Sequence, residues 1–170
     1  LLGTYEVRDL LGEGGMGQVF EAYDHSLGRV VAVKAAWADA PPRALEMEAK
    51  ALAAFRHPSL VVVHTLGEHD GVPFIVMERV YGVSLVDAMI DRAELGLRFE
   101  VAEVLDLLGA IAGGLSAVHR AGVAHRDVKP GNIMLSANRR FVLMDFGLFL
   151  PEFALESQTM VAGSPPYMAP

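Results

Sequence analysis

Five side chains with acid, base or amide chemistry lie within eight residues of one predicted loop, H-R-D-V-K-P-G-N at residues 125–132. Asp127 can accept a hydroxyl proton, Lys129 can stabilise the charge of a transferred phosphate, and Asn132 can hold a metal ion. Asp145 follows an apolar run and supplies a second oxygen donor for Mg²⁺. This combination predicts phosphoryl transfer, whereas a polar loop formed by chance is the alternative for one motif taken alone.

A glycine-rich segment, G-E-G-G-M-G-Q-V at residues 12–19, fits a turn that covers phosphate groups. Glycine lets backbone N–H groups approach a phosphate closely. The same glycine spacing marks dinucleotide-binding folds, in which a helix follows the glycines directly. Here the strand-like run Q-V-F-E-A-Y follows, so we expect the tip of a β-hairpin. A plain flexible hairpin is the alternative if no other motif accompanied it.

Lysine is rare in this chain, with three lysines against eleven arginines, and Lys34 lies in the apolar run V-A-V-K. A charged group in an apolar strand is costly unless a counter-charge meets it. Glu46 and Glu48, in the helical stretch that follows, are the candidate partners. A Lys–Glu pair can hold the ammonium group against phosphate oxygens. The alternative is a lysine that extends to solvent from the end of a strand.

The elements that would position these residues divide into a strand-rich first part and a helical second part. In the first part, runs of β-branched and aromatic residues predict five strands, at residues 5–11, 18–23, 29–35, 60–66 and 73–78. Apolar residues at helical spacing predict one helix, at residues 45–55, between the third and fourth strands.

The second part begins after Gly82, where the spacing of apolar residues changes. Helices are predicted over residues 85–94, with Ser84 as the N-cap, and over residues 100–120. Val104, Leu107, Leu108, Ile111, Leu115 and Val118 fall on one face of the longer helix. Its glycines, Gly109, Gly113 and Gly114, predict close packing against a neighbour. Two short strands, at residues 133–135 and 141–144, follow.

Composition excludes several classes of protein. Apolar residues make up 52% of the 170, and there are no cysteines, which excludes disulfides, thiolate zinc sites and a cysteine nucleophile. The net charge of −7 argues against nucleic acid as a partner. The acidic N-terminus does not resemble a signal peptide, and Asp106 and three glycines interrupt the most apolar stretch, residues 104–118. We therefore expect a cytoplasmic chain with no membrane segment, although the parent protein could carry an anchor outside it.

Together with D-F-G at residues 145–147 and G-S-P-P-Y-M-A-P at residues 163–170, these motifs resemble a protein kinase from about Tyr5 to the last residue. A lysine two residues after the loop aspartate is similar to the serine/threonine class, and the set looks most like bacterial eukaryotic-like kinases. The resemblance implies an α+β, two-lobe fold, truncated at the A-P-E segment. Its N-lobe, residues 1–80, would hold a five-stranded antiparallel sheet and one main helix. Its incomplete, mainly helical C-lobe would be residues 81–170.

The resemblance also implies a role for each matched residue. Asp127 would be the catalytic base, Lys129 would contact the γ-phosphate, and Lys34 would contact the other phosphates with Glu48 as its partner. Asn132 and Asp145 would hold Mg²⁺, with Mn²⁺ as an alternative. The implied ATP-binding residues are Leu11, Gly12, Gly14, Gly17, Val19, Ala32, Lys34, Glu48, Met77, Glu78, Val80 and Met134.

Regulation is implied as well, because an arginine before the catalytic aspartate is typical of kinases that are activated by phosphorylation. Arg126 would pair with the phosphate, and Ser157 and Thr159 are the available acceptors, with Thr159 favoured by position. The expected function is transfer of the ATP γ-phosphoryl group to serine or threonine hydroxyls of proteins, including autophosphorylation through self-association.

Two alternatives remain beside that function. The first is a truncated ATP-binding or interaction module without turnover in isolation, since the helices that would follow Pro170 in the family are absent from the chain. The second, a small-molecule phosphotransferase of related fold, is disfavoured because such enzymes lack the K-P-x-N and G-[ST]-P-x-Y-M-A-P features.

Overall fold

The computed structural model describes residues 2–14, 17–37, 45, 49 and 53–145. The chain divides into two compact units. The first unit comprises Leu1–Ala54 and Val62–Arg79, and the second comprises Phe55–Val61 and Val80–Pro170. The segment Phe55–Val61 therefore belongs to the second unit, although it lies within residues 1–80, the range that the sequence assigned to the N-lobe.

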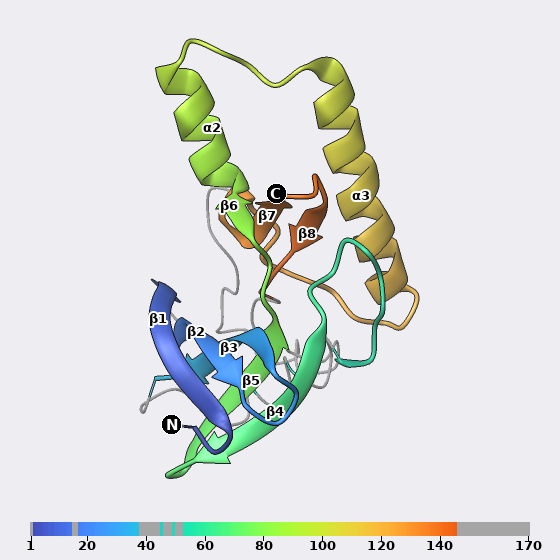
Figure 1. The fold of residues 1–170 in the computed structure, drawn as a ribbon. Helices are drawn as coiled ribbons and strands as arrows, with labels where there is room; N and C mark the ends of the chain where they lie inside the picture. The colour runs from blue at the N-terminus through green and yellow to red at the C-terminus, as the bar shows by residue number, and fades with distance from the viewer. Residues whose placement is uncertain (1, 15–16, 38–44, 46–48, 50–52, 146–170) are drawn as a thin grey trace. The chain divides into compact units, whose positions relative to one another are not determined.

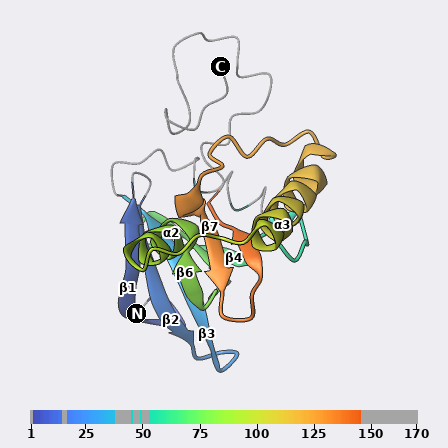
Figure 2. The same ribbon diagram turned by 90° about the horizontal axis from the view of Figure 1, so that it is seen from above.

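The first unit contains a five-stranded antiparallel sheet, as predicted from the sequence. Its strands follow the spatial order β1-β2-β3-β5-β4. The strands are β1 (Tyr5–Gly14), β2 (Gly17–Asp24), β3 (Arg29–Ala36), β4 (Val63–His69) and β5 (Val72–Glu78). Figures 1 and 2 show β1, β2 and β3 side by side, in agreement with their backbone pairing.

The predicted start of the fourth strand at residue 60 is wrong, because β4 begins at Val63. The first two residues of the predicted strand pair elsewhere. Leu60 forms a parallel bridge with Leu143, and the N–H of Val61 donates to the carbonyl of Leu143 over 3.1 Å. These backbone bonds hold residues 60–61 in the second unit, so only the remainder of the apolar run joins the sheet.

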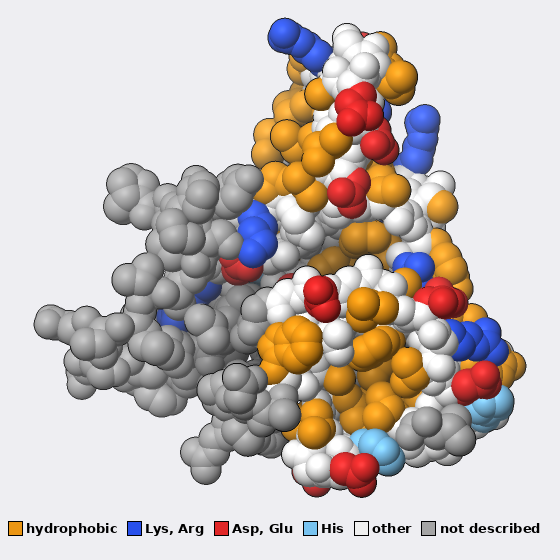
Figure 3. All heavy atoms as spheres, turned by 90° about the vertical axis from the view of Figure 1, so that its left-hand side faces the viewer, with side chains coloured by type: hydrophobic (Ala, Val, Ile, Leu, Met, Phe, Trp, Pro, Cys, Tyr) orange, Lys and Arg blue, Asp and Glu red, His pale blue; other side chains and the backbone are white. Residues whose placement is uncertain are grey.

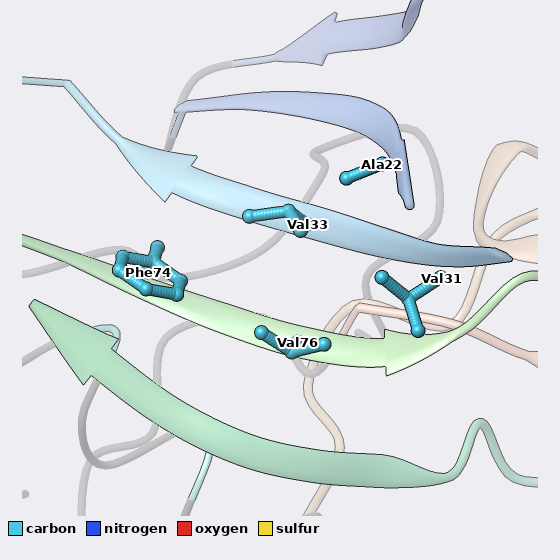
Figure 4. Packing of buried hydrophobic residues seen from close by; sticks show 5 residues of the cluster. All are labelled: Ala22, Val31, Val33, Phe74 and Val76. Carbon is cyan, nitrogen blue, oxygen red and sulfur yellow. The ribbon is translucent and has the colours of Figure 1, made fainter. Parts of the chain in front are cut away.

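The core of the first unit lies on one face of the sheet. Figure 4 shows this cluster of buried side chains, which come from β2, β3 and β5: Ala22, Val31, Val33, Phe74 and Val76. Tyr5 packs at its edge, with its ring 6.1 Å from that of Phe74 in an edge-to-face arrangement. Burial of these small and β-branched residues fixes the register of the strands, since a slip of one residue would turn them to the opposite face.

The predicted helix at residues 45–55 falls largely on residues outside the described part of the chain. Of those described, Leu45 and Ala49 are helical and buried, as their spacing predicts. Phe55 lies beyond the helical residues.

The second unit combines helices with a three-stranded sheet of order β6-β7-β8. Its elements are β6 (Gly82–Ser84), α2 (Leu85–Glu94), α3 (Val101–His119), the 3-10 helix η1 (Pro130–Asn132), β7 (Ile133–Ser136) and β8 (Phe141–Leu143). The sequence did not predict β6. A side chain at Gly82 would overlap the carbonyl of Leu135, so glycine is required where β6 meets β7.

α2 begins at the predicted residue and α3 begins one residue later than predicted, at Val101; side chains cap both helices. The Ser84 hydroxyl accepts from the N–H of Asp87 over 3.1 Å at the start of α2. Glu100 precedes α3 and forms a capping box with Glu103. The Arg92 guanidinium and the Glu100 N–H donate to the Glu103 carboxylate, which lowers its pKa to about 2.

The glycines of α3 explain how the second unit packs. A methyl group on Gly113 would lie 3.3 Å from the His57 ring, and one on Gly114 would lie 3.0 Å from Leu60. The predicted close packing is therefore confirmed at these two positions. At Gly109 no atom of the described residues lies within 4 Å of such a methyl group, so the structure does not show close packing there.

The predicted apolar face of α3 is buried in only part of its length. Ile111 and Val118 are buried, whereas Val104 is 38% and Leu108 58% exposed. By length and composition α3 could cross a membrane, and core helices of soluble proteins meet the same criteria. Exposed hydrophobic residues also occur on α2, over which Figure 3 shows apolar side chains gathered.

Candidate active site

Strand register brings four of the predicted nucleotide-binding residues to one face of the first unit's sheet. Val19 lies directly across from Lys34, and Ala32 lies directly across from Met77. Ala32 and Lys34 are two residues apart on β3, so their side chains point to the same side. The core cluster uses the alternate positions and lies on the opposite face. We call the face that carries Lys34 the lysine face.

Lys34 is a charged residue of the lysine face, and only 3% of its surface is exposed. An ammonium group at this depth is stable only beside groups of opposite charge or hydrogen-bond acceptors. The residue predicted as its partner, Glu48, lies outside the described residues, as does the other candidate, Glu46.

The glycine-rich segment is the hairpin between β1 and β2, as the following strand predicts. Gly12 lies across from Val19, and Gly14 lies across from Gly17. A side chain at Gly17 would overlap the carbonyl of Ala35, whereas none of the described residues has an atom within 4 Å of a Cβ at Gly12 or Gly14. Gly17 is therefore required for strand packing, and Gly12 and Gly14 leave open space next to the backbone. Leu11 precedes them and is partly exposed.

Trp37 is a feature of this hairpin that the sequence reasoning missed. Its indole Nε1–H donates to the carbonyl of Gly14 over 2.8 Å. The two residues are 23 positions apart in the chain, so no local sequence motif predicts the contact. Trp37 is the single tryptophan of the sequence, which makes it a natural fluorescent reporter of the glycine-rich hairpin.

The predicted adenine-binding segment begins at the end of β5. Glu78 is held at both its backbone and its side chain: its N–H donates to the Val62 carbonyl over 2.8 Å, and its carboxylate accepts from the Val62 N–H over 3.1 Å. Met77 is buried in the first unit, and Val80 is buried in the second. The segment is thus firmly bonded on the side of the first unit.

Asp127, Lys129 and Asn132 meet in the loop before β7, within the second unit. The Lys129 Nζ lies 2.8 Å from Asp127 Oδ2. The Asn132 Nδ2 donates to the same oxygen and to the backbone carbonyl of Asp127, each over 2.8 Å. The Asp127 side chain remains 16% exposed. A half-buried carboxylate fixed by two donors is oriented as a general base requires.

The loop also fixes the end of β8, which carries the second predicted metal ligand. The buried His125 ring contacts the Met144 carbonyl through Nε2 at 3.0 Å. The Met144 N–H donates to the Asn132 carbonyl over 2.7 Å. Asp145 follows directly, with a φ of 25°. Arg126 has a φ of 63°, so the backbone is strained beside both key carboxylates.

His125 is a neutral structural link in this network. Its Nδ1 accepts from the Asp127 N–H over 3.3 Å, so Nε2 carries the proton that is donated to Met144. Burial lowers the pKa of His125 below its usual value, because the charged ring would lose its hydration.

The donor set fits a hard divalent cation. Asn132 donates through Nδ2, so its amide oxygen is the atom that can bind a metal, and Asp145 adds a carboxylate. Among the described residues no group of three or more histidine, cysteine or acidic side chains is placed to hold a metal ion. Two protein oxygens, completed by phosphate and water, suit Mg²⁺ rather than zinc.

The remaining predicted residues differ in how far the structure describes them. Met134 lies on β7, across from Ser84 and Val142, and is partly buried. The D-F-G phenylalanine and glycine and both predicted phosphorylation sites, Ser157 and Thr159, lie outside the described residues.

Comparison with known proteins agrees with this arrangement. Residues 5–170 match the protein kinase domain family. The probable serine/threonine-protein kinase pknA2 of Bifidobacterium longum is 37% identical over 178 residues, covering 99% of this chain and 23% of that protein. The serine/threonine-protein kinase PknA of Mycobacterium tuberculosis is 37% identical over 182 residues, covering 100% of this chain and 41% of that protein.

Solved structures show the same likeness in three dimensions. The crystal structure of the M. tuberculosis PknI kinase domain aligns with a TM-score of 0.74 and 33% identity, covering 86% of this chain and 60% of that one. The chain thus spans less than two thirds of these relatives. Because the family match runs through nearly every residue and the fold agrees, this chain belongs to the protein kinase domain family.

Proposed function

We propose that the chain transfers the γ-phosphoryl group of ATP to serine or threonine hydroxyl groups of proteins. The observation that carries the proposal is the Asp127–Lys129–Asn132 cluster. Lys129 and Asn132 contact one carboxylate oxygen of Asp127, and the Asn132 carbonyl accepts from the N–H of Met144, the residue before Asp145. The names of the similar proteins, serine/threonine-protein kinases, support the acceptor class.

In this proposal each residue of the second unit has a distinct task. The substrate hydroxyl gives its proton to Asp127 while its oxygen forms a bond to the γ-phosphorus. The bond from that phosphorus to the β–γ bridging oxygen breaks, and ADP leaves with the electron pair. Lys129, held 2.8 Å from Asp127, stabilises negative charge on the phosphoryl group in transfer.

The first unit binds the nucleotide in this proposal. Lys34 contacts phosphate oxygens from the lysine face, and Val19, Ala32 and Met77 of the same face pack against adenine. The open space at Gly12 and Gly14 lets backbone N–H groups approach the phosphates. Asn132 and Asp145 would hold Mg²⁺, which when bound neutralises charge on the phosphate oxygens.

Regulation and location form the remaining part of the proposal. We infer that the chain phosphorylates itself, with Thr159 as the favoured acceptor before Ser157, and that Arg126 pairs with the phosphate. Mass spectrometry of the chain after incubation with Mg-ATP tests this choice. We also propose a cytoplasmic setting in which α3 is a packed helix, since Ile111, Gly114 and Val118 are buried in the second unit.

The test of the proposed function is γ-phosphoryl transfer from Mg-ATP to a generic basic protein and to the chain itself. Replacing Asp127 by Asn should lower the rate by about 10²–10⁴-fold, because the general base is lost. Asp106→Asn is the matched control, since Asp106 is an exposed carboxylate on α3 of the same unit. Equal rates for Asp127→Asn and the unmodified chain would refute the proposal, as would phosphate found only outside serine and threonine.

A further inference from the structure

An ion pair crosses the sheet of the first unit beside the predicted adenine-binding segment. The Arg79 Nε lies 2.9 Å from the Glu21 Oε2. The two side chains are only 19% and 21% exposed. They are 58 residues apart in the chain, and neither residue is among the site residues predicted from the sequence.

Register places this pair on the lysine face. Glu21 on β2 lies directly across from Ala32 on β3, which lies directly across from Met77 on β5. Side chains of residues paired in this way point to the same face of a sheet. Arg79 lies just beyond the end of β5, two residues after Met77, and its ion pair with Glu21 shows that its side chain reaches the same face. The small side chain of Ala32 leaves the arginine room to reach β2.

The position of Arg79 in the chain gives the pair its significance. Arg79 is the last residue of the first unit, and Val80 begins the second. Its neighbour Glu78 is bonded to Val62, on the β4 side of the sheet. Arg79 is bonded to β2, on the other side of β3. The backbone of residues 78–80 therefore leaves the sheet next to two bonds, one from Glu78 toward β4 and one from Arg79 to β2.

We propose that the Glu21–Arg79 pair is a positioning pair that fixes the backbone of residues 78–80 for the adenine base, and so sets the affinity of the chain for ATP. The inference rests on the proposed function, because it takes the lysine face as the nucleotide-binding face. A partly buried ion pair suits this task. If either partner is lost, the other charge is left buried without its counter-charge, and residues 78–80 are free to shift.

The test measures binding of Mg-ATP and of magnesium tripolyphosphate through the fluorescence of Trp37. Arg79→Ala and Glu21→Gln should each weaken ATP binding by about tenfold, and the double variant should lose no more than either single variant. Tripolyphosphate binding should not change, because it has no base. Arg8→Ala is the matched control, as Arg8 is an exposed arginine of β1 in the same sheet.

A charge exchange, Glu21→Arg together with Arg79→Glu, separates positioning from direct contact. It should restore ATP binding to within about threefold of the unmodified chain if the pair acts by holding the backbone. No rescue, or an equal loss of ATP and tripolyphosphate binding, would overturn the inference while leaving the proposed function intact. An unmodified chain that binds neither probe would overturn both.

Discussion

Lys34 in the first unit is positioned by the register of a sheet, whereas Asp127 in the second unit is positioned by side-chain bonds within one loop. Register is fixed by many buried residues at once, so Lys34 would keep its place through most single substitutions of its neighbours. Asp127 depends on Lys129, Asn132 and His125, each through one or two contacts.

The backbone conformation also differs between the strand that carries Lys34 and the loop that carries Asp127. The strands of the first unit hold Lys34 in ordinary extended conformation. The loop of the second unit holds Arg126 and Asp145 at positive φ angles of 63° and 25°. Such strain persists only where surrounding bonds impose it. The comparison teaches that a sheet can supply a stable binding face, while directed chemistry requires a loop that its own polar contacts hold in place.

Gly17 offers the largest expected effect on the first unit. Gly17→Ala should destabilise folding by about 2–4 kcal/mol, because a side chain would overlap the Ala35 carbonyl where β2 meets β3. Urea unfolding measures this loss. Gly12→Ala is the control, since Gly12 has open space around it and should change stability by less than about 1 kcal/mol. Equal losses for the two variants would remove the distinction between packing glycines and phosphate-facing glycines.

His125 offers a test of the second unit through pH. Its pKa in the folded chain lies below the unfolded value of 6.5, so its contribution to stability is complete above that pH and is lost as pH falls below it. The thermal midpoint of the unmodified chain should therefore fall between about pH 7 and about pH 5. His125→Gln should be less stable at the higher pH but less sensitive to pH. A parallel pH dependence of the two chains would show that His125 is not the titrating group.

The glycines of α3 should give the smallest effect. Gly109→Ala should stabilise the chain by about 1 kcal/mol, because alanine favours a helix and nothing lies near its side chain. Gly114→Ala should lose this gain, since Leu60 lies 3.0 Å from the added carbon and must shift. Thermal unfolding of both variants measures the difference. A Gly114→Ala chain as stable as Gly109→Ala would mean that close packing on α3 is not needed.

Much of this fold could be predicted from the sequence, because most of its elements form from residues that are close together in the chain. Runs of β-branched and aromatic residues predict the five strands. Ser84 predicts the start of α2, because serine is a preferred N-cap residue. The short strand β6 could not be predicted, because its three residues acquire a strand conformation only by pairing with β7, some 50 residues later. On α3, periodicity predicts an apolar face but does not say which of its residues are covered, and the structure buries Ile111 and Val118 while leaving Val104 and Leu108 exposed.

In the candidate site, too, local features could be predicted from the sequence and long-range contacts could not. Its motifs lie within short stretches of sequence, so the sequence predicts Asp127, Lys129 and Asn132 as one loop cluster. The contacts of Trp37 with Gly14 and of Arg79 with Glu21 join distant residues, and only the folded sheet brings them together. Sequence motifs record the reacting groups, whereas long-range contacts that position them require the structure.

The measurement that tests the central claim most directly compares Lys34→Met with Asp127→Asn for binding and for transfer. Binding of Mg-ATP is followed by Trp37 fluorescence, and transfer is followed in a single turnover. Asp127→Asn should bind ATP within about twofold of the unmodified chain but transfer about 10²–10⁴-fold more slowly, since it loses only the base. Lys34→Met should weaken binding as well as transfer. An Asp127→Asn chain that transfers phosphate at the unmodified rate would contradict the account.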